Sequence, residues 1–123
     1  MRRIATIALG VVSAAVLAVS AHAEAALDNM VGKWKWQDFT VECSKGGEHG
    51  LSCKVAAGPK NVGMEMIMSP IKTEGGAFVG KVKHPANGQV YNTKMTQPDK
   101  DSWKLDGCTD DGACATGTFV RVK

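Results

Sequence analysis

The sequence predicts an all-β fold, a small antiparallel up-and-down β-barrel of about eight strands with two disulfides. Three observations predict it. Apolar residues alternate with polar ones over short runs, turn-forming residues separate these runs, and the composition is rich in glycine and poor in leucine. A closed meander removes exposed strand edges, which suits many short strands in one small domain. A two-sheet sandwich is the alternative architecture.

The predicted strands are recognised by their period of two residues. Trp34 and Trp36 alternate with lysines, and the run 39–43 alternates apolar with polar residues. The same alternation is found over residues 64–68, 91–95 and 102–106, and the run 119–123 closes the chain. Clusters of Gly, Pro, Asn and Asp between the runs are typical turn signals. We also expect one short helical turn over residues 25–31.

The first 23 residues have the pattern of a secretory signal peptide. A basic start precedes an apolar run over residues 4–19, and Ala21-His22-Ala23 supplies the small residues that a signal peptidase accepts. We expect cleavage after Ala23 and one domain over residues 24–123. The domain would be periplasmic or secreted, because no later apolar run approaches the ~20 residues of a membrane span.

The charge balance excludes a strongly cationic nucleic-acid-binding protein. The whole chain has 15 lysines and arginines against 12 aspartates and glutamates, a net charge of +3. Two of the basic residues lie in the predicted leader, so 13 remain against 12 acidic residues and the net charge of the domain falls to +1. We therefore expect no nucleic-acid partner.

The four cysteines predict two disulfides, as is typical of short exported domains. We favour the pairs Cys43–Cys53 and Cys108–Cys114, because the two members of each pair flank a Gly-rich turn. Loops this short would stabilise the fold by roughly 2–3 kcal/mol each. The alternative is a four-thiolate zinc site. Its cysteines are normally two to four residues apart, whereas nine and five residues separate these pairs.

The beginning and end of the predicted barrel carry a paired signature. Gly32-Lys33-Trp34 starts the first predicted strand and Arg121 lies in the last one. This pairing resembles the lipocalin-like (calycin) signature, in which a G-x-W tryptophan at the closed end of the barrel packs under an arginine. The resemblance implies that the guanidinium covers the indole and donates hydrogen bonds to nearby carbonyls.

The resemblance extends to one bacterial family. With the segments 84–91, 105–108 and 119–121, the chain resembles the family catalogued as "domain of unknown function 2147" (DUF2147) over residues 31–122. It departs from the family pattern at His84, where an acidic residue often stands, and at Phe119, where tryptophan is frequent. The resemblance implies a small exported lipocalin-like barrel with no assigned activity.

The favoured function is the binding of a small apolar or amphipathic molecule by a non-enzymatic barrel. Aromatic and thioether side chains would form an adaptable apolar lining, with one tyrosine as a polar anchor; the candidates are Trp36, Met64, Met66, Met68, Tyr91 and Trp103. The same residues also fit ordinary core packing, because side chains can fill the interior of a small eight-stranded barrel.

A second hypothesis is an inhibitor of a secreted protease. The chain is similar in outline to bacterial metalloprotease inhibitors, which are exported barrels with a G-x-W start, a disulfide and a short N-terminal arm. In this hypothesis residues 24–30 form the arm that enters the protease cleft.

A third hypothesis uses the alternate methionines. Thioethers are soft ligands that select Cu(I) or Ag(I), and Met64, Met66 and Met68 would lie on one face of a strand. Core packing by these methionines is the simpler interpretation, so we expect no resident metal.

An enzyme is the least favoured class. The chain contains neither a G-x-S-x-G nor an H-E-x-x-H motif, and all four cysteines are assigned to disulfides. His49 and His84 are the histidines of the predicted domain, and we expect both to be isolated surface residues. No cofactor is expected.

Overall fold

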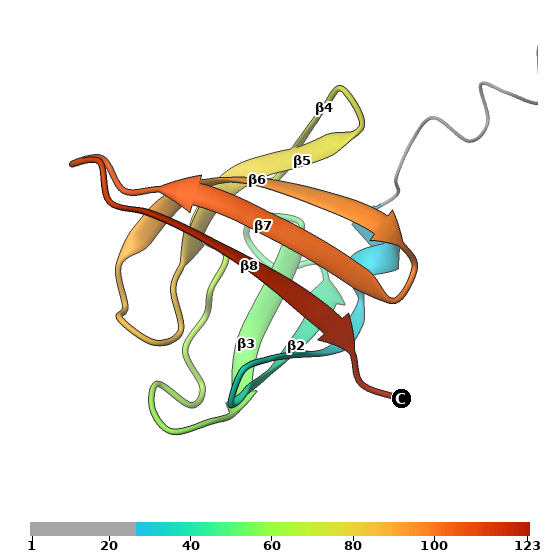
Figure 1. The fold of residues 1–123 in the computed structure, drawn as a ribbon. Helices are drawn as coiled ribbons and strands as arrows, with labels where there is room; N and C mark the ends of the chain where they lie inside the picture. Colours follow the sequence, from blue (N-terminus) through green and yellow to red (C-terminus); the bar gives the residue numbers. More distant parts are fainter. Residues whose placement is uncertain (1–26) are drawn as a thin grey trace, which may run out of the picture.

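The computed structural model describes residues 27–123, which form one curled antiparallel sheet of eight strands with almost no helix (Figure 1). The elements are η2 (Leu27–Met30), β1 (Gly32–Trp36), β2 (Phe39–Lys45), β3 (Leu51–Ala57), β4 (Lys72–Glu74), β5 (Ala77–Lys83), β6 (Val90–Asp99), β7 (Ser102–Cys108) and β8 (Cys114–Arg121). Neighbours follow the order β3-β2-β1-β8-β7-β6-β5-β4. The all-β, up-and-down prediction is confirmed, whereas the predicted signal peptide lies outside the described residues.

The segment 64–68 closes the barrel, but not as the strand that the sequence predicted. It makes only two isolated bridges, one to β3 and one to β5. The backbone N–H of Met66 donates to the carbonyl of Cys53 at 2.7 Å, and the Met66 carbonyl accepts from the N–H of Lys83 at 2.7 Å. β3 and β5 are therefore joined through this segment. Within this segment the adjacent residues Met66 and Ile67 are both buried. The predicted alternation of buried and exposed side chains is therefore wrong there.

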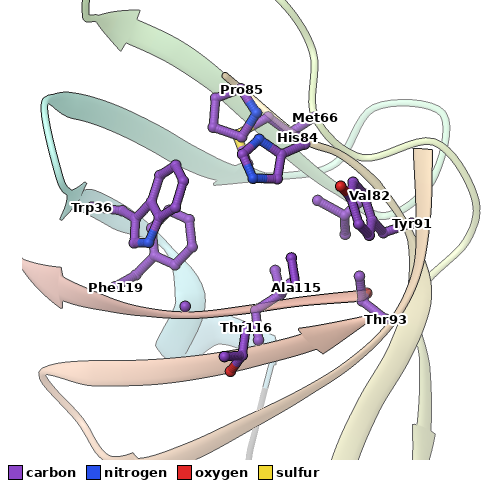
Figure 2. A pocket seen from close by; sticks show the side chains of 12 residues that line it. Trp36, Met66, Val82, His84, Pro85, Tyr91, Thr93, Ala115, Thr116 and Phe119 are labelled. Carbon is purple, nitrogen blue, oxygen red and sulfur yellow. The ribbon is translucent and has the colours of Figure 1, made fainter. Parts of the chain in front are cut away.

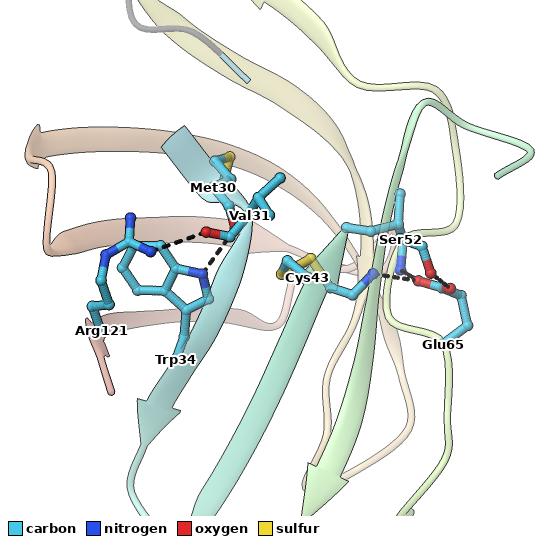
Figure 3. Close-up of a disulfide and its surroundings, with 9 residues drawn as sticks. Met30, Val31, Trp34, Cys43, Ser52, Glu65 and Arg121 are labelled. Atoms are coloured by element: carbon cyan, nitrogen blue, oxygen red, sulfur yellow. Dashed lines mark hydrogen bonds between the residues drawn. A yellow bond between two sulfur atoms is a disulfide. The ribbon is translucent and has the colours of Figure 1, made fainter. Parts of the chain in front are cut away.

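A carboxylate explains why this segment is not a regular strand. Glu65 accepts hydrogen bonds from the backbone N–H of Cys53 at 2.8 Å and of Ile67 at 3.0 Å, and from the hydroxyl of Ser52 (Figure 3). Burial by itself raises the pKa of Glu65, but these hydrogen bonds and the charge of Lys54 outweigh it. The pKa therefore lies below its ordinary value of 4.5. The ionised carboxylate thus takes the place of part of the backbone ladder.

Both predicted disulfides are present, and each joins directly paired residues of one hairpin. Cys43–Cys53 links β2 to β3, and both of its residues are buried in the core. Cys108–Cys114 links β7 to β8 at the end of their hairpin, where Cys114 is exposed. No free cysteine remains, so the zinc alternative is wrong.

Trp34 and Arg121 form the closed base of the barrel, as the lipocalin-like signature implied. The indole is fully buried, and its Nε1–H donates to the carbonyl of Met30 at 2.9 Å. The guanidinium carbon of Arg121 lies 4.3 Å from the centre of the Trp34 ring (Figure 3). Gly32 allows this approach, because its φ is 133° and a Cβ there would lie 2.6 Å from Arg121 Nη1.

The same arginine ties three chain segments together. Its guanidinium donates to the carbonyls of Val31 and Asn29, both at 2.9 Å, and to that of Lys100 at 2.7 Å. It also lies 3.2 Å from a carboxylate oxygen of Asp101. Arg121 therefore holds the entry to β1 and the β6–β7 turn against the last strand.

A layer of aromatic rings crosses the interior above this base. Phe39, Trp36, Phe119 and Trp103 come from the adjacent strands β2, β1, β8 and β7. Successive ring centres are 5.9, 5.9 and 4.5 Å apart, with interplanar angles of 19°, 25° and 10°. Trp103 then meets the Trp34 ring edge-on at 5.9 Å. This layer fills the barrel between its base and its opposite end.

We predict that Arg121→Lys lowers the free energy of unfolding by about 2 kcal/mol, because an ammonium lacks the planar fork that serves several carbonyls. For a domain of this size the melting temperature should fall by roughly 10 °C. Thermal unfolding followed by circular dichroism measures this change. The control is Lys123→Ala, which removes an exposed ion pair with Asp101 and should cost less than about 1 kcal/mol. Equal losses in the two variants would contradict the assigned role of Arg121.

We also predict an acid-sensitive closure. Because the folded-state pKa of Glu65 is depressed, its contribution to stability is complete above about pH 4.5 and is lost as the pH falls through the lower folded value. Glu65→Gln should therefore be less stable than the natural protein at pH 7, and the difference should shrink towards pH 3. Urea unfolding across this range measures it. Glu42→Gln, at an exposed position of β2, is the control and should change the free energy of unfolding at pH 7 by less than about 1 kcal/mol.

Candidate ligand pocket

A small apolar pocket lies at the end of the barrel opposite the Trp34 base. Its walls come from the end of β1, the end of β5 and the start of β6, together with β7 and β8. The space open to the centre of a water molecule is about 30 Å³, enough for roughly two waters or a small alkyl group. Side chains thus fill most of the interior at this end of the barrel and leave a narrow opening.

Three of the six predicted lining residues surround this pocket. Trp36 comes from β1, Tyr91 from β6 and Met66 from the closing segment. Figure 2 shows Trp36 beside Phe119 on one side of the opening and Tyr91 beside Val82 on the other. The predicted aromatic and thioether lining is therefore present in part.

The other three predicted residues lie elsewhere. Trp103 is 1% exposed and lies within the aromatic layer, where Phe119 separates it from Trp36. Met64 packs against the edge of the core. Met68 lines a separate groove beside the β2–β3 turn. For Met64 and Met68 the predicted alternation is wrong because the segment 64–68 bridges β3 and β5 and is not itself a regular strand.

Trp36 presents its edge to the pocket. Phe39 and Phe119, from the strands on either side of β1, stack against its two faces. Gly117 makes room for the nitrogen-bearing edge, since a Cβ there would lie 2.7 Å from Trp36 Nε1. Among residues 27–123, the indole whose buried N–H has no acceptor is that of Trp103, which lies in the same aromatic layer.

His84 belongs to the pocket, and the expectation of an isolated surface residue is wrong. Its ring meets Trp36 edge-on at 5.1 Å and lies 5.5 Å from Tyr91. Its Nδ1 accepts the backbone N–H of Ala86 at 3.0 Å, so the neutral ring carries its proton on Nε2. Burial lowers the pKa of His84 below its ordinary value of 6.5. Extending the two-residue alternation of β5 from the buried Val82 to residue 84 would have predicted that His84 faces inward.

The rim of the pocket is an ordered turn. His84 N–H donates to the carbonyl of Gln89 at 2.8 Å, and Asn87 Nδ2 donates to the hydroxyl of Tyr91 at 3.0 Å. Asn61, from the loop after β3, donates through Nδ2 to the Pro85 carbonyl at 2.7 Å. These contacts hold His84 and Tyr91 in place at the opening.

Phe119, Ala115 and Gly117 are further pocket residues that the sequence analysis did not name as lining. They alternate along β8 and face inward, while Thr118 between them is exposed. The same alternation was visible in the sequence. Ala115 and Gly117, however, are too small to be recognised as lining residues from the sequence. The space that they leave depends on how the neighbouring strand packs against them.

The structure does not gather the three methionines around one point. Met66 lines the pocket, whereas Met68 lines the groove beside the β2–β3 turn. Within the part of the chain that the structure describes, no group of three or more His, Cys, Asp or Glu residues could hold a metal ion. His49 is half-buried and lines that groove, at a turn whose other residues are exposed.

The predicted N-terminal arm is described only from Leu27 onwards. Leu27 packs against the core and Met30 is 1% exposed. Asp28 forms an ion pair with Lys45 at 2.7 Å, and Asn29 accepts hydrogen bonds from two side chains. Residues 27–30 are thus part of the barrel, and protease inhibition stays a prediction.

Comparisons with known proteins found no match from which a function could be inferred. The chain matches no protein-family model, no curated protein and no solved structure. The resemblance to domain of unknown function 2147 therefore stays a prediction from the residues that suggested it. Across residues 27–123, no helix has the length and apolarity to cross a membrane.

We predict that the pKa of His84 in the folded protein lies below 6.5, because burial disfavours the charged ring. Protonation of Nδ1 also removes the acceptor for the Ala86 N–H, so the Ala86 amide signal should titrate with the same midpoint. NMR spectra recorded from pH 4 to 8 measure both. A midpoint at or above 6.5, or an Ala86 amide that does not follow the ring, would contradict the described packing.

Proposed function

We propose that the protein binds the apolar part of a small amphipathic molecule in the pocket at the open end of the barrel. The observation that carries this proposal is an apolar opening whose only ionisable lining residues, among those described, are His84 and Tyr91. An apolar opening with polar groups at its rim is typical of sites that bind amphipathic molecules.

The size of the pocket limits the ligand. A volume of about 30 Å³ takes a short alkyl group and excludes bulky polycyclic molecules unless the walls move. Burying one or two methylenes at about 0.8 kcal/mol each contributes roughly 1–2 kcal/mol. With a few further contacts this corresponds to dissociation constants in the millimolar range or somewhat tighter.

The proposed binding would take place outside the cytoplasm. The leader pattern of residues 1–23 supports export, and so do two disulfides in so small a domain. A periplasmic location fits a protein that collects or carries a small molecule there.

We predict that 1-hexanol and hexanoate shift the NMR signals of Trp36 and Ala115 in the natural protein. Ala115→Leu adds three carbons to the wall and should weaken binding at least ~10-fold, because displacing two buried methylenes at about 0.8 kcal/mol each costs about 1.6 kcal/mol. Thr118→Leu makes a similar change on the exposed face of the same strand and should leave binding unchanged. The proposal fails if neither probe binds, or if the two variants behave alike.

A further inference from the structure

His84 gives the apolar pocket a wall whose charge can change near neutral pH. Tyr91 is the other titratable residue among the described residues that line the pocket, and no lysine, arginine, aspartate or glutamate is among them. Histidine is the side chain whose ordinary pKa lies closest to neutral pH. The charged residues next to lining residues in the chain all lie outside the pocket wall: Lys35, Glu65, Lys81, Lys83, Lys94, Lys104 and Asp106.

The His84 ring is part of the aromatic wall itself. Figure 2 shows it at the opening, with Trp36 on one side and Tyr91 on the other. Its centre lies 5.1 Å from that of the Trp36 ring, which it meets edge-on, and 5.5 Å from that of the Tyr91 ring. The residue is half-buried, so a ligand in the pocket would cover more of the ring.

One hydrogen bond holds the ring in its neutral form. The backbone N–H of Ala86 donates to Nδ1 of His84 at 3.0 Å, and a protonated Nδ1 would set two donor hydrogens against each other. The turn itself is held by other contacts: Gly88 N–H donates to the His84 carbonyl at 2.8 Å, and Asn61 Nδ2 donates to the Pro85 carbonyl at 2.7 Å. The contact that protonation removes is therefore the one that fixes the ring in the wall.

A charged ring is also costly beneath an apolar ligand. Burial already lowers the pKa of His84 below its ordinary value of 6.5. An alkyl group in the pocket would displace water from the ring, and the described lining residues include no carboxylate that could pair with the resulting charge. The neutral ring thus suits an apolar ligand, and the protonated ring does not.

We propose that the pocket releases its ligand on acidification, because it binds an apolar group while His84 is neutral and loses it when the ring is protonated. This inference rests on the proposed function, since it adds the regulation of binding at the same pocket. Binding and protonation are linked reciprocally, so the bound ligand must in turn stabilise the neutral ring.

The first test follows the affinity for 1-hexanol, which does not itself titrate in this range. NMR titrations of the natural protein run from pH 7 to one pH unit below the midpoint measured for His84. At that lower limit only about a tenth of the protein carries a neutral ring, so the apparent affinity should fall roughly 10-fold. A fall of less than about threefold overturns the inference and leaves the proposed function standing. If hexanol does not bind at pH 7, both fail.

The second test removes the titration and keeps the turn. The His84→Asn variant can offer its amide oxygen to the Ala86 N–H in place of Nδ1. Its affinity for hexanol, whatever the value at pH 7, should change by less than about threefold over the same pH range. His49→Asn, which removes the other histidine of residues 27–123, is the matched control and should keep the full fall. An equal fall in His84→Asn and in the natural protein assigns the acid effect to another group, such as Glu65, and overturns the inference.

The third measurement needs no variant. Saturation of the natural protein with hexanol should lower the titration midpoint of the His84 ring by about one pH unit, which is the reciprocal of a 10-fold loss of affinity. NMR spectra of the ring recorded with and without hexanol measure this shift. A midpoint that stays the same or rises in the presence of bound hexanol overturns the inference, even if the affinity for hexanol falls in acid.

Discussion

The contact between Arg121 and Trp34 is the interaction on which the rest of the structure depends. It joins the first and last strands of the chain, which are neighbours inside the sheet and pair through only two registered positions. The guanidinium covers the buried indole and donates to carbonyls from two other segments. With so short a β1–β8 ladder, these side-chain contacts hold the β3-β2-β1 part of the sheet against the part that begins with β8.

The aromatic layer lies between the Trp34 base and the pocket at the other end of the barrel. Phe39, Trp36, Phe119 and Trp103 stack across four adjacent strands, so the barrel has no continuous internal channel at their level. Because the rings stack face to face across the interior, they leave little space for a ligand. The layer therefore explains the small volume of the pocket.

The closing segment shows how the barrel avoids an open seam. β3 and β5 do not pair directly, and residues 64–68 lie between them with the Glu65 carboxylate as an additional acceptor. This closure also places Met66 in the wall of the pocket. A wall held partly by one ionised side chain is more sensitive to acid than a regular ladder, which links the stability of the fold to the pocket.

The fold class, both disulfide pairs and three of the six lining residues could be predicted from the sequence, and the lipocalin-like resemblance added the base residues Gly32, Trp34 and Arg121. Strand periodicity, Gly-rich turns and cysteine spacing are local properties, so they can be recognised along the chain. Which inward-facing residues meet could not be predicted, because it depends on how distant strands pack against one another. His84 and Phe119 join Trp36 because distant strands become neighbours, and Trp103 is removed from the pocket because Phe119 covers it. A pocket is a gap between strands, and its position depends on packing that no single run of residues contains.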